Sequence, residues 1–368
     1  MRPWPGSPRA PAAVAAGLCG CCLLLLAGTR LPLRPVPVGV PPLEDSGRVL
    51  GRPVTELWSA SRPEQAWFTD DQCRPLVSRF TRDHSLPLVY LASFPRSGNT
   101  WTRYLLEAST GLITGGSSMP NYRQYKAHAF TERLSDENLW KYVNRQGMMV
   151  RLGYLGGSIP WSVGATIVTK THAWPEPFTE QETAIVNKTS HKFSPFPKNV
   201  TRRAILIIRD PFKSFISLKK YGKTKSVLNE EDMSELFTGA AWEKFAVAYG
   251  RIWLEMNARW IANTEQLHVV TYERLAQDTM AELRSMLQFL DVQPDRRRLQ
   301  CLAGALDGRA HNHRHGVVPD EQTYPLPVRS KVWLNIHQLN WLLRQRGFPG
   351  LPLERYSFAD EFGDLMEA

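Results

Sequence analysis

Continuous apolar runs alternate with helical patterns through the middle of the chain. Runs rich in β-branched residues and leucine suit strands covered on both faces, and they occupy residues 86–93, 165–169, 204–208 and 267–271. A turn over residues 94–99 and a helix from Thr100 follow the first run. Strands separated by helices predict an α/β fold with a mainly parallel sheet and helices on both faces.

One long apolar stripe lies between the third and fourth runs. Its large side chains recur at three- and four-residue steps: Trp242, Phe245, Tyr249, Ile252, Met256 and Trp260. A shorter stripe repeats the pattern at Leu283, Met286, Leu287 and Leu290. Both stripes predict helices whose apolar sides belong to the core rather than to a ligand site.

The N-terminus has a different pattern. Arg2 and Arg9 precede an uncharged run over residues 10–29 that contains four consecutive leucines. Positive charge before an apolar run is typical of a secretory signal or signal-anchor, and about 20 apolar residues can cross a bilayer. Because a proline-rich stretch follows, we expect an uncleaved anchor, although small residues at Ala27 and Gly28 leave cleavage open.

These patterns predict four regions. Residues 1–9 form a cytosolic tail and residues 10–29 a signal-anchor transmembrane segment. Residues 30–85 form a Pro-rich stem and the approach to the folded part, because proline fixes φ and removes backbone donors. Residues 86–368 form the folded domain.

The charge and the cysteine content of the chain fit a protein of the secretory pathway. The formal net charge of +10 indicates anionic partners, namely nucleic acid, phosphorylated cofactors, acidic glycans or membranes, or else a solubilising surface. Outside the apolar run only Cys73 and Cys301 remain, and they form either one disulfide or two buried thiols. Asn187 and Asn199 begin N-glycosylation sequons, which predict a lumenal glycoprotein.

The turn after the first strand carries candidate chemistry. A helix start offers unpaired N–H groups and partial positive charge, so it binds phosphate-like anions. Gly98 allows close approach to a ligand, and Arg96 supplies a fixed cation. Further donors come from Ser97, Asn99 and Thr100. The GxxxxGK[ST] spacing is absent, which disfavours an ATPase or GTPase.

Polar residues also end the other predicted strands. Lys170 and His172 follow the second strand, Arg209 the third and Tyr272 the fourth. Ligands bind at the carboxyl ends of strands in open α/β sheets, so these side chains are candidates for one site. A structural histidine and an ordinary helix start, with Asp210 as its N-cap, are the alternatives.

The sequence FPRSGNTW at residues 94–101 resembles the 5′-phosphosulfate loop of sulfotransferases, commonly written PKSGTTW. It is most similar to the sulfotransferase domain of WSC-domain-containing, sialate O-sulfotransferase-like proteins. The resemblance implies a P-loop-like α/β fold over residues 86–368. It also implies that the loop binds the 5′-phosphosulfate of 3′-phosphoadenosine 5′-phosphosulfate through Arg96, Ser97, Gly98, Asn99, Thr100 and Trp101. Arg96 replaces the usual lysine and can stabilise charge but is a poor general acid.

The same resemblance assigns the other strand ends. Arg209 and Ser217, eight positions apart, match the element that binds the 3′-phosphate. Tyr272 matches a tyrosine near the adenine. The Lys-Thr-His segment implies that His172 is the catalytic base and that Lys170 holds the sulfonate oxygens. Glu107 is an alternative base, because glycan-directed members often use a glutamate.

The resemblance therefore implies an enzyme that transfers a sulfuryl group from 3′-phosphoadenosine 5′-phosphosulfate to a glycan hydroxyl, with sialic acid as a candidate acceptor. No metal is expected, because cationic side chains compensate the charge. We expect a single-pass type II membrane protein of the Golgi, with a lumenal catalytic domain and no nucleic-acid partner. The acceptor is expected across residues 111–164, whose cations include Arg123, Lys126 and Arg151.

Two other functions stay open. A catalytically silent lumenal protein that binds a nucleotide or glycan is one alternative, and Arg96 in place of lysine favours it. Another phosphate-handling transferase, such as a kinase, is the second, and a requirement for magnesium distinguishes it. The sequence does not specify the oligomeric state.

Overall fold

A five-stranded parallel sheet is the centre of the protein. The computed structural model describes residues 47–116, 149–150, 152–159, 163–173, 175, 202–224, 234–308 and 323–363. The sheet has the order β6-β7-β5-β8-β9, from strands β5 (Tyr90–Ser93), β6 (Gly115–Gly116), β7 (Thr169–Thr171), β8 (Arg203–Ile208) and β9 (Gln266–Thr271). Every neighbouring pair is parallel, which confirms the predicted mainly parallel α/β fold.

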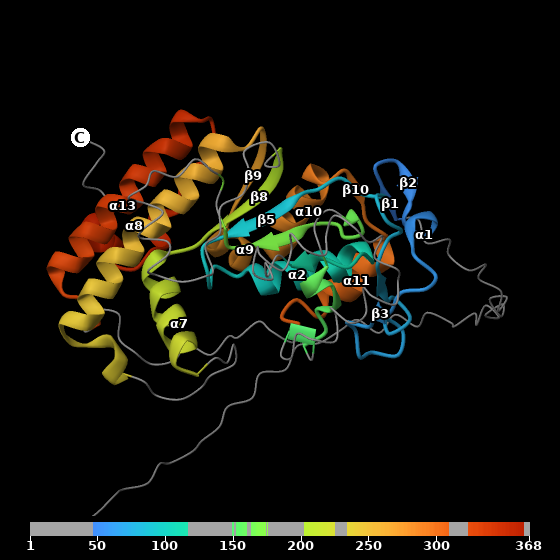
Figure 1. Ribbon diagram of the computed structural model, residues 1–368, viewed down its shortest axis with the longest axis horizontal. Helices are drawn as coiled ribbons and strands as arrows, with labels where there is room; N and C mark the ends of the chain where they lie inside the picture. Colours follow the sequence, from blue (N-terminus) through green and yellow to red (C-terminus); the bar gives the residue numbers. More distant parts are fainter. Residues whose placement is uncertain are drawn as a thin grey trace, which may run out of the picture. The chain divides into compact units, whose positions relative to one another are not determined.

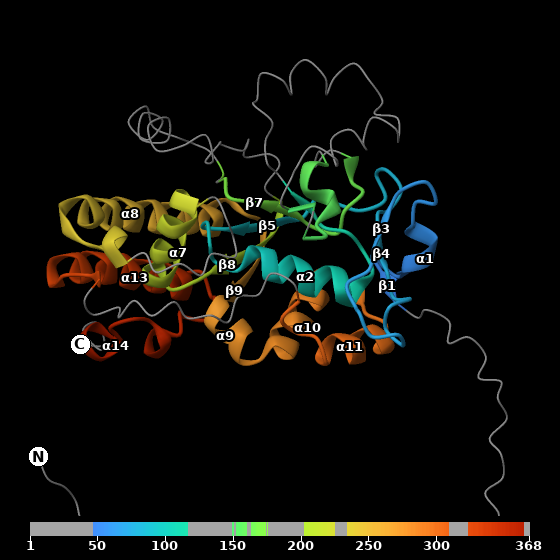
Figure 2. The same cartoon turned by 90° about the horizontal axis from the view of Figure 1, so that it is seen from below.

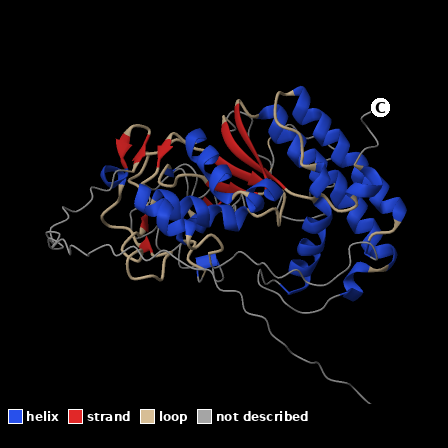
Figure 3. Ribbon diagram, turned by 180° about the vertical axis from the view of Figure 1, so that it is seen from behind, coloured by secondary structure: helices blue, strands red, loops and turns tan. Residues whose placement is uncertain are grey.

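Helices cover both faces of this sheet (Figure 3). Alternate residues of β5 and β8 point to opposite faces, as strand geometry requires. Tyr90 and Leu206 belong to one core cluster with the long helices α8 (Gly239–Asn263) and α13 (Leu326–Gln345). Leu91 and Ile205 belong to the other, with α2 (Asn99–Thr110) and α10 (Thr279–Phe289).

The two long helices α8 and α13 pack along each other (Figure 1). The predicted stripe on α8 is core at Trp242, Met256 and Trp260, which are almost fully buried, whereas Phe245 and Tyr249 of the same stripe are only half-buried. Helix α7 (Pro211–Thr224) and the 3₁₀ helix η4 (Ser234–Phe237) connect β8 to α8. The carboxyl end of β5 points toward α7, so this edge of the sheet meets the starts of several helices (Figure 1).

Short elements complete the chain around the sheet. They are β1 (Arg48–Val49), β2 (Arg52–Pro53), α1 (Val54–Leu57), β3 (Glu64–Gln65), β4 (Ser78–Arg79), η1 (Leu155–Ser158), α9 (Tyr272–Gln277), β10 (Val292–Gln293), α11 (Arg296–Ala303), η5 (Leu353–Arg355) and α14 (Ala359–Phe362). Strands β10, β1 and β2 form a small antiparallel sheet, and β3 pairs with β4.

Residues 47–85, which the sequence places ahead of the folded domain, contribute to its core. Val54, Trp67 and Phe68 are buried in the cluster that contains α2 and α10. In Figure 2, β1, β3, β4 and α1 lie beside α2 and α11. The predicted tail and anchor, residues 1–29, lie outside the described residues. Within the described ranges, no helix is both long enough and apolar enough to cross a bilayer.

Candidate active site at the carboxyl edge of the sheet

The turn between β5 and α2 is a tight loop with two left-handed backbone positions. Arg96 has φ 70° and Gly98 has φ 93°, and Gly98 is the N-cap of α2. A Cβ at position 98 would lie 2.5 Å from Cδ2 of Tyr272. Glycine is therefore required at position 98 for two reasons: the backbone angle and the contact with the Tyr272 ring. This contact joins the loop to the end of β9.

Two arginines from different strands meet at this loop. The guanidinium of Arg209 donates through Nη1 to the carbonyl of Arg96 at 2.8 Å. Arg96 in turn donates through Nε to Oγ of Ser217 on α7 at 2.9 Å. Burial, and then the nearby charge of Arg209, lower the pKa of Arg96. Two neighbouring cations of which one is largely desolvated favour an anionic ligand, because an anion relieves their repulsion.

Aromatic rings form the adjoining wall. The guanidinium carbon of Arg209 lies 4.2 Å from the centre of the Tyr272 ring. Trp101 meets Tyr272 edge-on with ring centres 5.9 Å apart, and its Nε1 donates to the carbonyl of Leu306 at 2.8 Å. The two rings and the guanidinium hold one another in place, so Tyr272 has a fixed orientation beside the loop.

The polar side chains of the loop have different surroundings. Oγ of Ser97 and Nε of Arg209 are buried and have no hydrogen-bond partner among the described residues. Asn99 instead faces the sheet, where its amide donates to the carbonyl of Leu91 at 3.1 Å and to Oγ of Ser93 at 3.0 Å. Oγ of Ser97, Nε of Arg209 and Oδ1 of Asn99 thus keep hydrogen-bonding capacity that a ligand could use, whereas the NH₂ group of Asn99 supports the loop from below.

His172 lies just beyond the end of β7, next to the end of β5. Its Nδ1 is 2.8 Å from the carbonyl oxygen of Ser93, which can only accept a hydrogen bond. Nδ1 therefore carries the proton in the neutral ring, and Nε2 is the basic nitrogen. The sheet register pairs Lys170 with Leu91, so this cation lies one strand away from the loop and is half-buried.

Comparison with known proteins agrees with this geometry. The family model described as "Sulfotransferase domain" matches residues 86–304, which is more than half of the chain and includes every element of this site. The chain belongs to the sulfotransferase domain family. WSCD family member CG9164 of Drosophila melanogaster is 30% identical over 220 residues, which cover 59% of this chain and 55% of that protein. WSCD family member AAEL009094 of Aedes aegypti is 26% identical over 216 residues, which cover 58% and 53%.

The chain spans about half the length of the curated relatives it matches. Similarity also extends to solved structures. Mouse sulfotransferase SULT7A1 complexed with PAP is 13% identical with a TM-score of 0.37, and the match covers 72% of this chain and 86% of that one. Retinol dehydratase in complex with androsterone and inactive cofactor PAP is 13% identical with a TM-score of 0.35, covering 68% and 80%.

The side chain of Glu107 is buried in a set of hydrogen bonds. Its Oε1 accepts from the backbone N–H of Thr114 at 3.0 Å and from that residue's hydroxyl at 2.5 Å, and its Oε2 accepts from Nε1 of Trp67 at 3.1 Å. Arg103, also buried, donates to the Thr114 hydroxyl at 2.7 Å. Because the described contacts of both carboxylate oxygens are with residues 67 and 114, this arrangement favours His172 over Glu107 as the base.

The pKa of Glu107 predicts a pH effect on stability. Burial raises its pKa to about 7 even though Arg103 lowers it. A raised carboxyl pKa stabilises the folded state below the unfolded pKa, and this contribution is lost as pH rises through about 7. Glu107→Gln should remove a component on the order of 3 kcal/mol from the fall in unfolding free energy between pH 4.5 and pH 8. Urea unfolding of the wild type and Glu107→Gln across this pH range measures the difference. Glu243→Gln, at an exposed position, is the control. Parallel curves of unfolding free energy against pH for the wild type and Glu107→Gln contradict the prediction.

A buried carboxylate pair, Asp210 and Glu273, lies behind the site, and the sequence interpretation did not predict the contact between them. Glu273 follows Tyr272 and Asp210 follows Arg209, so each acid adjoins a candidate ligand residue. Burial, and then Asp210, raise the pKa of Glu273 to about 7. The only signal in the sequence was that Asp210 adjoins Arg209 and Glu273 adjoins Tyr272. The side chain of Asp210 also accepts from the N–H of Phe212 at 2.9 Å. This is the hydrogen bond expected of Asp210 as the N-cap of α7.

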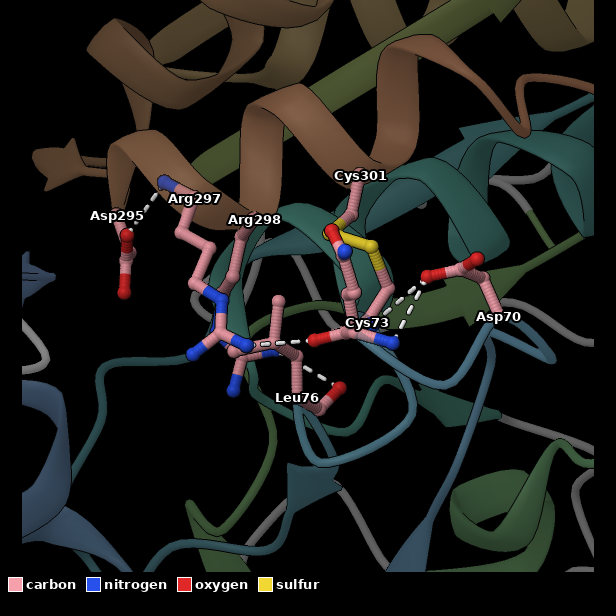
Figure 4. The surroundings of a disulfide bond; sticks show 8 residues. Asp70, Cys73, Leu76, Asp295, Arg297, Arg298 and Cys301 are labelled. Carbon is pink, nitrogen blue, oxygen red and sulfur yellow. Dashed lines mark hydrogen bonds between the residues drawn. A yellow bond between two sulfur atoms is a disulfide. The ribbon is translucent and has the colours of Figure 1, made fainter. Parts of the chain in front are cut away.

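The disulfide question is settled by the geometry. Cys73 and Cys301 form a bond that ties the N-terminal segment to α11, with their Cα atoms 5.9 Å apart (Figure 4). The neighbouring Arg298 is buried and donates to the carbonyl of Val77 at 2.8 Å. Residues 72–77 are therefore held to the domain by covalent and polar contacts together.

Other residues singled out from the sequence lie elsewhere. The sequons at Asn187 and Asn199 and the cations Arg123, Lys126 and Arg151 are outside the described residues. Thr100 is at the first turn of α2, and its carbonyl accepts from the hydroxyl of Tyr154 at 2.7 Å. The structure thus brings together the loop, Arg209, Ser217 and Tyr272, with His172 at the neighbouring strand end.

Proposed function

We propose that this sulfotransferase uses 3′-phosphoadenosine 5′-phosphosulfate and transfers its sulfuryl group to a hydroxyl of a glycan. The observation that supports this best is the meeting of Arg96 and Arg209 at the start of α2, where their positive charges are adjacent. A ligand with two separate phosphate groups suits two such cations better than a single phosphate does.

The residues fit such a nucleotide. The first amides of α2 and the unpartnered hydroxyl of Ser97 suit the 5′-phosphosulfate. Arg209, whose buried Nε has no described partner, and Ser217 suit the 3′-phosphate. The Tyr272 ring, fixed against Arg209, suits the flat adenine.

The proposed reaction is an in-line transfer. The acceptor oxygen bonds to sulfur as the bond from sulfur to the nucleotide phosphate breaks, and Nε2 of His172 takes the acceptor proton. Arg96 and the loop amides stabilise the charge that develops on the departing phosphate. Lys170 holds the sulfonate oxygens in this proposal. These side chains supply the charge compensation, so the proposed reaction involves no metal ion.

A glycan acceptor is supported by an aromatic surface beside the loop. The half-buried rings of Phe245 and Tyr249 on α8 stack with centres 4.2 Å apart. Tyr249 also meets Phe94, two residues before Arg96, with ring centres 6.3 Å apart. Nζ of Lys219 lies 4.9 Å from the centre of the Phe245 ring. Flat rings suit the apolar face of a sugar, and the nearby ammonium suits a sugar carboxylate such as that of sialic acid.

We also propose a Golgi location with the catalytic domain in the lumen and a type II anchor at residues 10–29. The disulfide between Cys73 and Cys301 supports an oxidising compartment, because such bonds form and persist along the secretory route. Arg2 and Arg9 ahead of the apolar run support the orientation.

Transfer of labelled sulfate tests the proposed activity and acceptor. Purified protein with labelled 3′-phosphoadenosine 5′-phosphosulfate and excess EDTA should label a sialylated glycan more than its desialylated form. Phe245→Ala with Tyr249→Ala should raise the acceptor KM about tenfold or more, because each lost aromatic contact costs about 1 kcal/mol. The nucleotide KM should change little. Labelling of neutral glycans alone contradicts the acidic acceptor, and no transfer of the label to any glycan contradicts the proposed activity.

A further inference from the structure

The buried acids Asp210 and Glu273 each follow one residue of the proposed nucleotide site, Arg209 or Tyr272, whose side chains stack on each other. Asp210 is 0% exposed and Glu273 is 9% exposed. Burying two carboxylates is costly unless hydrogen bonds compensate. Their contacts therefore show what the two acids hold in place.

Glu273 connects two separate strand ends. Its Oε1 accepts from the backbone N–H of Asp210 at 2.9 Å. The same two turns also meet where the Arg209 guanidinium stacks on the Tyr272 ring. The hydrogen bond and the stack together fix the spacing between the end of β8 and the start of α9. Without the carboxylate, the N–H of Asp210 would lose its described partner in a buried position.

The side chain of Asp210 fixes the same turn from the other side. Its Oδ2 accepts from both the backbone N–H and the hydroxyl of Ser357, each at 2.9 Å. Ser357 belongs to residues 351–363, beyond the part of the chain that matches the family, which ends at residue 304. The C-terminal segment is thus bonded to the residue next to the phosphate-binding arginine.

Two further hydrogen bonds hold the backbone around Arg209. Nε1 of Trp253 on α8 donates to the carbonyl of Arg209 at 3.2 Å. The hydroxyl of Tyr324 donates to the carbonyl of Phe212 at 2.7 Å. Residues 209–212 are consequently held by α8, α9 and the C-terminal segment at once, which leaves the Arg209 backbone one position.

We propose that Glu273 is a positioning residue for nucleotide binding, acting through the Asp210 N–H to hold Arg209, and that Ser357 serves the same turn from the C-terminal segment. This inference rests on the proposed function, because Arg209 is taken to bind the 3′-phosphate. Glu273 does not touch the ligand itself; it sets the distance between Arg209 and Tyr272. Substitution of Glu273 should therefore lower the affinity for the nucleotide and leave the KM for the acceptor nearly unchanged.

Titration calorimetry with 3′,5′-adenosine bisphosphate tests this on the full chain. Glu273→Ala should weaken binding about tenfold, because an unsatisfied buried donor costs about 1–3 kcal/mol. Glu273→Gln should restore affinity to within about threefold of wild type, since the amide oxygen still accepts from Asp210. Ser357→Ala, which keeps the backbone bond, should weaken binding about threefold.

A destabilised control separates positioning from general loss of stability. Leu339 is a buried core residue of α13. Leu339→Ala leaves a cavity in this core and should lower the Tm without changing nucleotide affinity. If the Glu273→Ala and Glu273→Gln proteins bind alike, or if Leu339→Ala weakens binding as much, the positioning role is wrong. If Glu273→Ala does not fold, unchanged binding by Ser357→Ala contradicts the proposal. No binding by the wild type contradicts the proposed function instead.

Discussion

Arg209→Ala is expected to weaken binding of 3′,5′-adenosine bisphosphate about a hundredfold or more. Arg209 lies at the carboxyl end of β8, where its guanidinium is held between the Arg96 carbonyl and the Tyr272 ring. Charge-assisted hydrogen bonds to a phosphate are worth about 1.5–3 kcal/mol each, and a guanidinium can make two. Titration calorimetry of the variant and wild type measures the loss.

Arg203→Ala is the matched control for this substitution. Arg203 begins the same strand, β8, at the opposite edge of the sheet, where it forms an ion pair with Asp291 at 2.8 Å. It removes the same charge from the protein, so a difference between the two variants reflects position. Equal losses of affinity in both variants, or none in Arg209→Ala, contradict the assigned role of Arg209.

His172→Ala is expected to lower kcat by about a hundredfold to ten-thousandfold, the range for a lost general base. The bond from Nδ1 to the Ser93 carbonyl leaves Nε2 as the nitrogen that accepts a proton. Affinity for 3′,5′-adenosine bisphosphate should stay near that of the wild type, because the imidazole is assigned to the acceptor side. Single-turnover transfer of labelled sulfate measures the chemical step apart from binding.

His268→Gln serves as the control for His172→Ala. His268 lies in β9 and stacks on Phe289 with ring centres 5.3 Å apart. Its loss should leave kcat close to the wild-type value. If His172→Ala retains full kcat, another group is the base. Glu107→Gln then becomes the informative variant, because Glu107 is the other candidate.

The strands were predictable from the sequence where apolar and β-branched residues dominate the run. Residues 204–208 and 267–271 agree with β8 and β9 to within one residue. The predicted second strand, 165–169, overlaps β7 only at Thr169. Apolar residues such as Ile167 instead form extended chain before the ladder, where the Ile167 N–H donates to the carbonyl of Ile113 at 3.1 Å. The apolar run thus located the strand in the chain but not its first and last residues.

The edge strand β6 had no sequence signal. It consists of Gly115 and Gly116, which have no side chains to produce an apolar pattern. Close approach explains these residues, since a Cβ at Gly116 would lie 2.7 Å from the carbonyl oxygen of Gly157. Strand order was equally inaccessible, because hydrophobic periodicity gives the face of a strand but not its neighbours.

The sequence located the candidate site residues better than it located what supports them. Arg96, Arg209 and Tyr272 stood out because each follows a predicted strand and matches a known motif. The supporting roles of Glu273 and Ser357 were missed: Glu273 had only its adjacency to Tyr272 as a signal, and Ser357 had none, because its partner Asp210 is 147 residues away. The NH₂ group of Asn99 donates to Leu91 and Ser93 beneath the loop, a supporting role that the sequence did not indicate, and the assignment of Asn99 to the nucleotide stays a prediction.

Thermal denaturation with two nucleotides tests the central claim most directly. A cradle formed by Arg96 and Arg209 for two phosphate groups predicts that 3′,5′-adenosine bisphosphate raises the Tm, by an amount that grows with the logarithm of its concentration above the Kd. Adenosine 5′-monophosphate, which lacks the 3′-phosphate, should raise it far less at the same concentration. No shift with saturating bisphosphate, or equal shifts with both nucleotides, would contradict the account.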